Sequence, residues 1–430
     1  MKSFQLRTDP GQRPVAGTVL LDWFAAPSAS TISVGRHFLD GLAPNPMALD
    51  FLRVAGAVFV ADKSASRDSV ADGWTRDIAV QVPVSDPDSW LGVAGELSAL
   101  LGFLSGDRWQ LDFAADSEPE PTATTLDTQE AVCLFSGGLD SLAGAIELLE
   151  EGRDLMLVGH HDSSLTDNRQ VELFHELETH YGPGRVHQRR LLLRPKAKAA
   201  ATTTRSRSIL FLAAGIAVAD GLSEHAPLVV PENGFIGVNV PLTAARSGSF
   251  STRTTHPYFL RRLEEILAAL GLAHPIENPF RLKTKGEVLA ESSNRALLAR
   301  LAPRTVSCSH GEAPRWRDRQ QGNCGYCYPC LIRRASMHRV GLDGPADYSW
   351  DALTDPTVWR DPQLKTGRDL RALTASLAGP VRPSDVLRNG PIPSGEAGAF
   401  FDLYRRGRDE IRAWIGDGAD PDLRRRCGLA

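Results

Sequence analysis

Short apolar strands alternate with amphipathic helices over the middle of the chain, and this alternation limits the fold more than any other feature. Strand-like segments occur at 131–135, 154–161, 186–193 and 227–230, and helical patterns such as 207–222 separate them. Strands joined in this way form a parallel sheet covered on both faces, and ligands gather at the carboxyl ends of its strands. We therefore predict an α/β fold with a doubly wound parallel sheet.

A serine and two glycines follow the first of these strands and open the first helix. The segment, SGGLDS at 136–141, directs unpaired backbone N–H groups at one point, where a phosphate oxygen fits. It can also be read as a plain helix start with Ser136 as N-cap. Its place after the first strand favours an anion-binding loop, as do Asp140, which can orient Mg²⁺, and Ser141, whose hydroxyl can reach phosphate.

Four of the chain's six cysteines are clustered late in the middle region. They are Cys308, Cys324, Cys327 and Cys330, with fifteen residues between the first two and two residues between each of the others. This spacing predicts a closed structural zinc site with four thiolate ligands. An iron–sulfur cluster or four reduced thiols without metal are the weaker alternatives.

Composition excludes several classes of protein. A formal net charge of −4 argues against tight, sequence-independent binding to duplex nucleic acid. The basic N-terminus has no long apolar core behind it, and the apolar run 209–219 is too short to span a bilayer. We expect a cytoplasmic protein that does not bind membranes, in which Cys133 and Cys427 are inert packing or surface residues.

The chain divides into segments of different composition. Residues 116–129 are acidic, contain proline and lack large apolar side chains, so we predict a linker there. Before it, residues 1–115 are expected to form a mixed α+β domain. After it and the middle region, residues 343–430 are expected to form a helical extension that docks on the body. The specific expectations are strands at 18–24, 53–61, 78–84 and 108–113, a helix at 89–104, and a helix at 398–415.

The SGGLDS segment resembles the SGGxDS loop of the N-type ATP pyrophosphatases, the PP-loop enzymes with a HUP-like fold. In that superfamily the loop holds the pyrophosphate of ATP while a substrate oxygen attacks the α-phosphorus, which gives an adenylate. Backbone N–H groups aimed in advance can stabilise the charge on the departing pyrophosphate. The resemblance implies that ATP and Mg²⁺ bind here and that the loop supplies the contacts, through Ser136, Gly137, Gly138, Leu139, Asp140 and Ser141.

The loop and the cysteine cluster occur together, with Arg333 close behind the last cysteine, and this combination resembles the 7-cyano-7-deazaguanine synthase (QueC) family. The resemblance covers residues 130–342. Those enzymes use ATP to activate 7-carboxy-7-deazaguanine, then add ammonia and dehydrate the amide to a nitrile. This chain departs from the family because it is longer and because its first cysteine spacing is wider.

The front region and the segments 158–164, 232–242 and 251–257 resemble the QueC-like proteins of anti-phage operons, the QatC family of the Qat system. That resemblance implies that the adenylated deazaguanine is passed to an amine, such as the N-terminus of a QatB-like partner protein. The alternatives are nitrile formation, and a non-catalytic subunit that senses ATP or a deazapurine. A tRNA substrate is a weaker alternative, suggested by Trp316 among Arg315, Arg317 and Arg319.

Further charged residues are candidates for the same site. Arg205 and Arg253 are predicted to clamp phosphate or a substrate carboxylate, although each also suits a solvated helix start. His160 and His161 end the second strand of the sheet and are expected to flank the nucleotide, with a turn-capping role nearly as plausible. Lys283 follows a strand in the FRLKTKGE segment and would by itself be an unremarkable surface lysine, but the resemblance implies that it meets the triphosphate.

Four more polar or charged residues are candidates for the site. Arg207 shares the helix start with Arg205, and Lys285 is two positions beyond Lys283. Glu232 and Asn233 follow the 227–230 strand, where an acid and an amide suit the donor edge of a guanine-like ring. Asn233 is equally suited to hold a turn before the following glycine.

Overall fold

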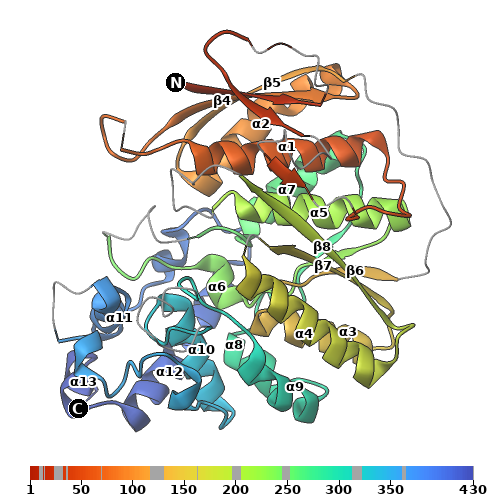
Figure 1. The fold of residues 1–430 in the computed structure, drawn as a ribbon. Helices are drawn as coiled ribbons and strands as arrows, with labels where there is room; N and C mark the ends of the chain where they lie inside the picture. The colour runs from red at the N-terminus through yellow and green to blue at the C-terminus, as the bar shows by residue number, and fades with distance from the viewer. Residues whose placement is uncertain are drawn as a thin grey trace.

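Two parallel β-sheets and a helical C-terminal region make up the computed structural model (Figure 1). The predicted linker falls largely outside the described residues, since only Asp116 of that segment is described. The described residues are 1–8, 13, 15–23, 32–34, 37–68, 70–116, 130–161, 163–195, 205–244, 252–311, 322–360 and 365–429.

The central sheet has six strands, and all of its pairings are parallel except that of β3 with β8. The prediction of an α/β fold with a parallel sheet is therefore confirmed at that level. In spatial order the strands are β10 (Ile276–Glu277), β9 (Leu228–Val229), β6 (Ala131–Leu134), β7 (Leu155–His161), β8 (Val186–Pro195) and β3 (Ile32–Val34).

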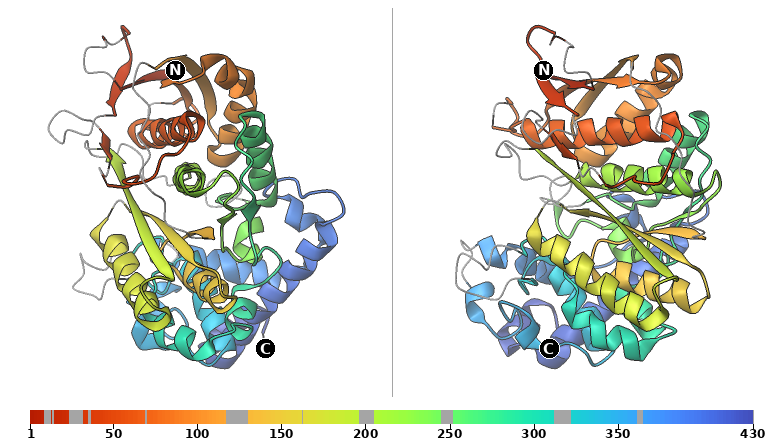
Figure 2. Two further views of the ribbon diagram at one scale, coloured as in Figure 1. Left: turned by 90° about the vertical axis from the view of Figure 1, so that its right-hand side faces the viewer. Right: turned by 45° about the vertical axis from the view of Figure 1, so that its right-hand side comes forward.

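Helices cover both faces of the central sheet because successive side chains of its strands point to opposite sides. In β6, Val132 and Leu134 enter the core on one face, whereas Ala131 and Cys133 enter the core on the other. The first face is covered by α5 (Arg207–Leu222), and the second by α3 (Leu139–Glu150) and α4 (Ser164–Tyr181) (Figures 1 and 2).

The strand order reverses between β6 and β9. The chain runs outward from β6 to β7 and β8, then returns to the other side of β6 to form β9 and β10. In an open sheet of this kind, the connections leave the two neighbouring strands in opposite directions and a crevice opens at their carboxyl ends. The SGGLDS loop follows β6 and Glu232 follows β9, so both lie at this crevice.

The N-terminal sheet is parallel throughout, in the order β2 (Val19–Asp22), β1 (Lys2–Arg7), β4 (Asp77–Val84), β5 (Arg108–Ala115). The helix expected at 89–104 lies within α2 (Pro87–Ser105). The strand expected at 53–61 is wrong, because those residues belong to α1 (Pro46–Ser64). Asn45 caps that helix by accepting a hydrogen bond from the Ala48 N–H.

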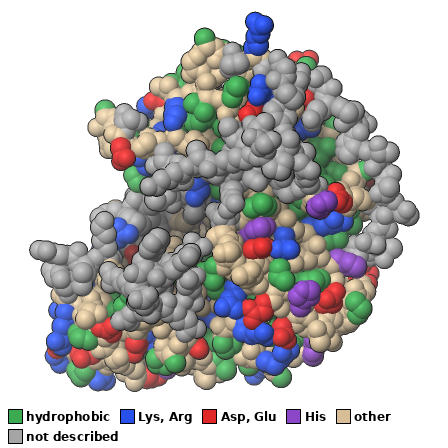
Figure 3. Space-filling view, viewed as in Figure 1, with side chains coloured by type: hydrophobic (Ala, Val, Ile, Leu, Met, Phe, Trp, Pro, Cys, Tyr) green, Lys and Arg blue, Asp and Glu red, His purple; other side chains and the backbone are tan. Residues whose placement is uncertain are grey.

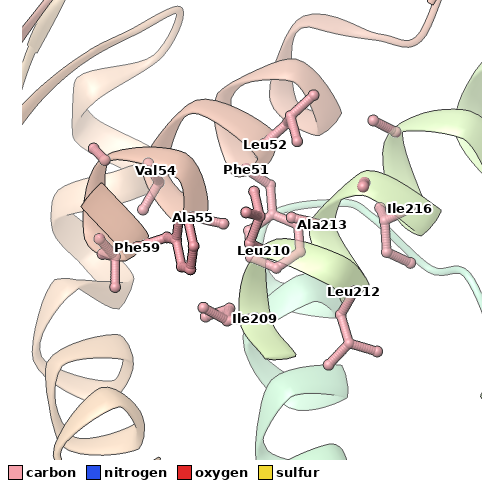
Figure 4. Close-up of a cluster of buried hydrophobic side chains, with 14 of the residues drawn as sticks. Phe51, Leu52, Val54, Ala55, Phe59, Ile209, Leu210, Leu212, Ala213 and Ile216 are labelled. Atoms are coloured by element: carbon pink, nitrogen blue, oxygen red, sulfur yellow. The ribbon is translucent and has the colours of Figure 1, made fainter. Parts of the chain in front are cut away.

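The N-terminal sheet and the central sheet share one hydrophobic core. Figure 4 shows α1 side chains, including Phe51 and Phe59, packed against Leu210 and Ala213 of α5. Helix α7 (Pro257–Ala269) packs against α2 and adds Phe259 to the same core. Residues 1–115 thus fold against the body of the protein and do not form a core of their own.

The C-terminal region contains more helices than the sequence indicated. Its longest helix, α12 (Ala397–Gly418), covers the expected segment, and α11 (Arg368–Ala378) and α13 (Pro421–Arg426) accompany it. They pack around α10 (Tyr328–Arg339) in a core that contains Cys324, Cys327 and Cys330. Shorter elements complete the chain: α6 (Gly234–Val238), α8 (Lys285–Ala290), α9 (Arg295–Leu301), and the 3-10 helices Ala302–Arg304, Pro345–Asp347, Pro356–Val358, Lys365–Gly367 and Pro383–Leu387.

No helix among the described residues is long and apolar enough to cross a membrane. On the face shown in Figure 3, basic and acidic side chains are interspersed over α4 and α9. Ion pairs join these charges, as between Arg304 and Glu172 at 2.6 Å. Arg315, Trp316, Arg317 and Arg319, on which the tRNA alternative rests, lie outside the described residues.

Replacing Phe59 with alanine tests the shared core. Phe59 is fully buried between the two sheets, so Phe59→Ala should lower the free energy of unfolding by about 3–5 kcal/mol. Urea denaturation followed by tryptophan fluorescence and by circular dichroism should give one shifted transition. Two separate transitions, of which only one moves, would show that residues 1–115 fold independently.

Candidate functional site

A cleft of about 350 Å³ lies at the reversal of strand order in the central sheet. Ser136, Gly137 and Ser141 line it from the loop after β6, and Val230 and Glu232 line it from the end of β9. The rest of the lining comes from the start of α5, the start of α4, the turn before α7, and Val306 and Cys308. The predicted anion-binding loop therefore faces a cavity of the size that small-molecule sites have.

Backbone geometry explains the glycines and serines of the loop. Gly137 has φ of +78°, a left-handed conformation that a side chain would strain. The Ser136 hydroxyl accepts a hydrogen bond from the Gly138 N–H at 3.3 Å, and the Ser141 hydroxyl donates to the Gly138 carbonyl oxygen at 3.0 Å. These bonds close the loop at the N-terminus of α3, where the helix dipole favours an anion.

Asp140 lies in the first turn of α3 and is only 7% exposed. Its Oδ2 accepts hydrogen bonds from the Lys285 Nζ, with which it forms an ion pair, and from the Asn233 Nδ2 at 3.2 Å. Its Oδ1 is buried and has no hydrogen-bond partner. A buried carboxylate oxygen without a partner is costly, so this atom is suited to a ligand that the structure does not contain.

Glu232 lies beside Asp140 and lines the cleft, partly exposed to it. Burial raises the pKa of Glu232 well above its usual value, and both the negative charge of Asp140 and a side-chain hydrogen bond between the two carboxyl groups raise it further, while the charge of Lys285 lowers it. A cation bound between the two groups would take the place of the proton that they share. The Asn233 Nδ2 bridges the two carboxylates, because it also lies 3.4 Å from the Glu232 Oε1. Two neighbouring carboxylates, one with an unpartnered oxygen, form a donor set that fits a hard divalent cation such as Mg²⁺.

A short segment that ends at Cys308 holds the loop from the other side. The Val306 N–H donates to the Gly137 carbonyl oxygen at 3.0 Å, and the Leu139 N–H donates to the Ser307 hydroxyl at 3.2 Å. The Ser307 N–H in turn donates to the Asn323 Oδ1 at 3.0 Å, next to the second cysteine. The cysteine cluster and the anion-binding loop are therefore joined by direct hydrogen bonds.

The four clustered cysteines converge as predicted, with their sulfur atoms all within 4.8 Å of one another. The Sγ atoms of Cys308 and Cys327 are 3.8 Å apart, and those of Cys324 and Cys330 are 3.9 Å apart. Zn–S bonds of about 2.3 Å in a tetrahedron place the sulfur atoms about 3.8 Å apart, so the cluster could hold zinc.

Glycine at position 325 is required for this cluster. Gly325 has φ of +85°, and a Cβ atom there would lie 2.1 Å from the Trp350 carbonyl oxygen. Pro329 is the second residue of α10, where its missing N–H costs no helical hydrogen bond. Apart from this cluster, Cys133 is fully buried in β6, and burial raises the pKa of its thiol to about 12, which fits the expectation that it is inert.

Comparisons with protein-family models, with curated proteins and with solved structures found no match to this chain.

The structure does not bring Arg205 and Arg253 into the cleft. Arg205 donates to the Ser105 carbonyl oxygen at 2.7 Å and stacks over Trp74, and burial lowers its pKa to about 10. Arg253 donates to the Asn389 Oδ1 at 3.2 Å and lies 4.4 Å from the centre of the Phe103 ring. Both guanidinium groups join parts of the fold to one another, and neither lines the cleft.

Arg207 lines the cleft in place of Arg205, and His160 holds it there. The Arg207 Nε donates to the His160 Nδ1 at 3.0 Å, and its NH2 group donates to the His160 carbonyl oxygen at 2.8 Å. Because Nδ1 accepts, Nε2 carries the proton and donates to the Leu193 carbonyl oxygen at 3.0 Å. His160 is completely buried and positions Arg207, contrary to the expectation that it flanks the nucleotide.

His161 and Lys283 also lie outside the cleft lining. The His161 Nε2 is 3.5 Å from the Asp167 Oδ1, and the Lys283 Nζ pairs with the Glu291 Oε2 at 2.9 Å near the surface. Lys285, two positions beyond Lys283, is the lysine that reaches the loop.

Sequence reasoning missed several residues of the cleft. Thr166 and Arg169 line it from the start of α4, which follows β7 at the same edge of the sheet, so their position after a strand was a usable signal. Phe211 and Leu212 line it from α5, where they read only as core residues. Ser307 carried no signal at all, because its contact with the loop is 168 residues away along the chain.

Mutation of one clustered cysteine tests the metal centre. Purified protein should contain one zinc ion per chain by elemental mass spectrometry. Cys324→Ser should lose both the zinc and thermal stability, because a structural zinc site needs all four of its thiolate ligands. Cys133→Ala, outside the cluster, should keep the metal. Full zinc content in Cys324→Ser, or iron in place of zinc, would contradict the assignment.

Proposed function

We propose that this protein is an adenylate-forming enzyme that uses ATP and Mg²⁺ to activate a carboxylate and then transfers the acyl group to an amine. The observation that carries the proposal is the arrangement around Asp140. A glycine loop at a helix N-terminus opens into a cleft, and the buried Asp140–Lys285 pair beneath it leaves one carboxylate oxygen unpartnered. This combination supports binding of a phosphate chain together with a cation.

The charges around the cleft suit a triphosphate. Arg169 and Arg207 line it, and Lys285 lies beneath the loop. As pyrophosphate departs, negative charge accumulates on it, and the N-terminus of α3 and these cations are already in place to stabilise that charge. Asp140 and Glu232 would hold Mg²⁺, which would neutralise charge on the phosphates when bound.

The proposed reaction has two steps. A carboxylate oxygen of the substrate attacks the α-phosphorus of ATP, the bond to the bridging oxygen breaks, and pyrophosphate leaves with that oxygen and its electron pair. An amine nitrogen then attacks the acyl carbon, loses a proton, and displaces AMP to give an amide. Ser141 and the loop would orient the phosphates, and the apolar side chains of Phe211, Leu212 and Val230 would exclude water from the acyl adenylate.

The identity of the substrate rests on the sequence resemblance. The loop and the cysteine cluster together favour 7-carboxy-7-deazaguanine as the carboxylate, and the QatC-like segments favour a protein amine, such as the N-terminus of a QatB-like partner in anti-phage defence. Ammonia, and with it nitrile formation, is the alternative acceptor. The aromatic side chain of Phe211 lines the cleft, and an aromatic ring there supports binding of a planar heterocycle.

Two neighbouring lysines provide a matched test. Lys285→Ala should reduce ATP-dependent pyrophosphate release in the presence of 7-carboxy-7-deazaguanine by about 10²–10³-fold, because it removes a cation and leaves Asp140 buried without its partner. Lys283→Ala, which removes the same charge near the surface, should behave as the unmodified protein.

Omission of single components provides the control for this assay. Pyrophosphate release should require 7-carboxy-7-deazaguanine, and mass spectrometry should find the acyl group on a partner protein when one is supplied. Equal ATP consumption without any deazapurine would contradict the proposed substrate. Bound nucleotide without any adenylate would indicate a sensor instead of an enzyme.

A further inference from the structure

Helix α12 contacts two short helices, α6 and α8. Each of these helices has a residue at its N-terminal end that meets Asp140. Asn233 immediately precedes α6 and Lys285 begins α8, and both donate hydrogen bonds to the Asp140 Oδ2. We infer that α12 is a brace that positions Asn233 and Lys285, so that the C-terminal extension sets the affinity of the cleft for nucleotide. The inference about nucleotide rests on the proposed function, whereas the brace itself rests on contacts within the fold.

One part of the brace packs against α6. A Cβ atom on Gly407 would lie 2.2 Å from the Phe235 ring, so the helix backbone lies directly against that side chain. The rings of Phe235 and Tyr404 are stacked with their centres 5.8 Å apart. Leu403 also packs on Gly234, where a Cβ atom would lie 2.7 Å from the Leu403 Cδ2. The first turn of α6, directly after Asn233, is thus fixed by α12.

The other part of the brace holds the start of α8. Glu410, with only 8% of its side chain exposed, accepts a hydrogen bond from the Thr284 hydroxyl and fills the space beside Gly286. The Arg406 Nε donates to the Glu287 Oε1 at 2.6 Å. Thr284 and Glu287 form the capping box of α8, with bonds of 3.0 and 2.8 Å between them. Both capping residues of the helix that begins with Lys285 are therefore bound by α12.

The two parts act on one unit. The Gly234 N–H donates to the carbonyl oxygens of Phe280 and Lys283, both at 3.0 Å, which ties the start of α6 to the segment before α8. Leu403, Gly407 and Glu410 are four and three residues apart, a spacing that places them on one face of a helix. One face of α12 thus holds both donors to Asp140.

The brace acts through position, because no α12 residue lines the cleft among the described residues. A buried ion pair stabilises only when its geometry is good, and a displaced Lys285 would leave the Asp140 carboxylate poorly compensated. A shift of about 1 Å in a positioned group can change binding or catalysis by about a hundredfold. Loosening α12 should therefore weaken nucleotide binding while the sheet stays folded.

Two pairs of matched variants test the brace. Gly407→Ala forces α12 away from Phe235, whereas Gly416→Ala changes a glycine of the same helix that has no atom within 4 Å of its Cβ position. Glu410→Ala removes the bond to Thr284 together with the ion pair to Arg339, whereas Asp409→Ala removes the exposed neighbouring carboxylate. Glu410→Gln keeps an oxygen that can accept from Thr284 and serves as the rescue variant.

The measurements are hydrogen–deuterium exchange in the full-length protein and equilibrium binding of ATP with Mg²⁺. In Gly407→Ala and Glu410→Ala, exchange should become faster at 233–239 and 284–290, and ATP affinity should fall by about tenfold or more. Gly416→Ala and Asp409→Ala should match the unmodified protein in both measurements, and Glu410→Gln should recover most of the affinity.

The two measurements separate the two claims. Unchanged exchange at 233–239 and 284–290 would overturn the brace. Faster exchange with unchanged ATP affinity would overturn the claim that the brace sets the affinity of the cleft for nucleotide. If the unmodified protein binds no ATP while exchange responds as expected, the brace within the fold is supported and the proposed function is overturned.

Discussion

The ion pair between Asp140 and Lys285 is the contact on which the proposed site depends. Asp140 is 7% exposed and Lys285 is 5% exposed, so each would be an uncompensated buried charge without the other. Removal of one partner of such a pair typically costs about 3–5 kcal/mol. The pair spans 145 residues of sequence and joins the helix that follows the glycine loop to the helix that α12 holds. A ligand that binds the Asp140 Oδ1 would therefore contact the ion pair that links α3 to α8.

Three described segments outside the glycine loop support the cleft through a small number of contacts. The segment that ends at Cys308 ties the loop to the cysteine cluster, and α12 fixes the donors to Asp140. At the start of α5, the Ser206 hydroxyl donates to Asp62 of α1. Ser206 immediately precedes Arg207, which lines the cleft. The N-terminal region therefore supports the start of α5 through α1, in addition to contributing residues to the hydrophobic core. Loss of either flanking region would change the geometry of the cleft.

The sequence was informative where the signal is local. The SGGLDS loop, the cysteine cluster and helices α5 and α12 could be predicted, because turn chemistry, ligand spacing and amphipathic periodicity all act over short stretches. The strand expected at 53–61 is wrong because that run, rich in valine and alanine, is apolar on nearly all sides of the helix that it forms. Helix α1 is buried between two sheets, and such a helix carries the same signal as a buried strand.

The sequence did not indicate which of two neighbouring residues would face the cleft or the loop, because that depends on the direction of each side chain in space. Arg205 and Arg207, like Lys283 and Lys285, are two positions apart at the start of a helix, where the chain turns and neighbours point to different surroundings. Nothing in the local pattern tells which member of each pair faces the loop. Ser307 and Glu410 act through contacts far along the chain, so only the fold reveals them.

A crystal structure of the protein soaked with Mg²⁺ and a non-hydrolysable ATP analogue tests the central claim most directly. The account predicts that the terminal phosphates lie against the backbone N–H groups of residues 136–141, with a cation at Asp140 Oδ1 and Glu232. Phosphates bound elsewhere, or a loop that stays closed by its own side chains at saturating nucleotide, would contradict it.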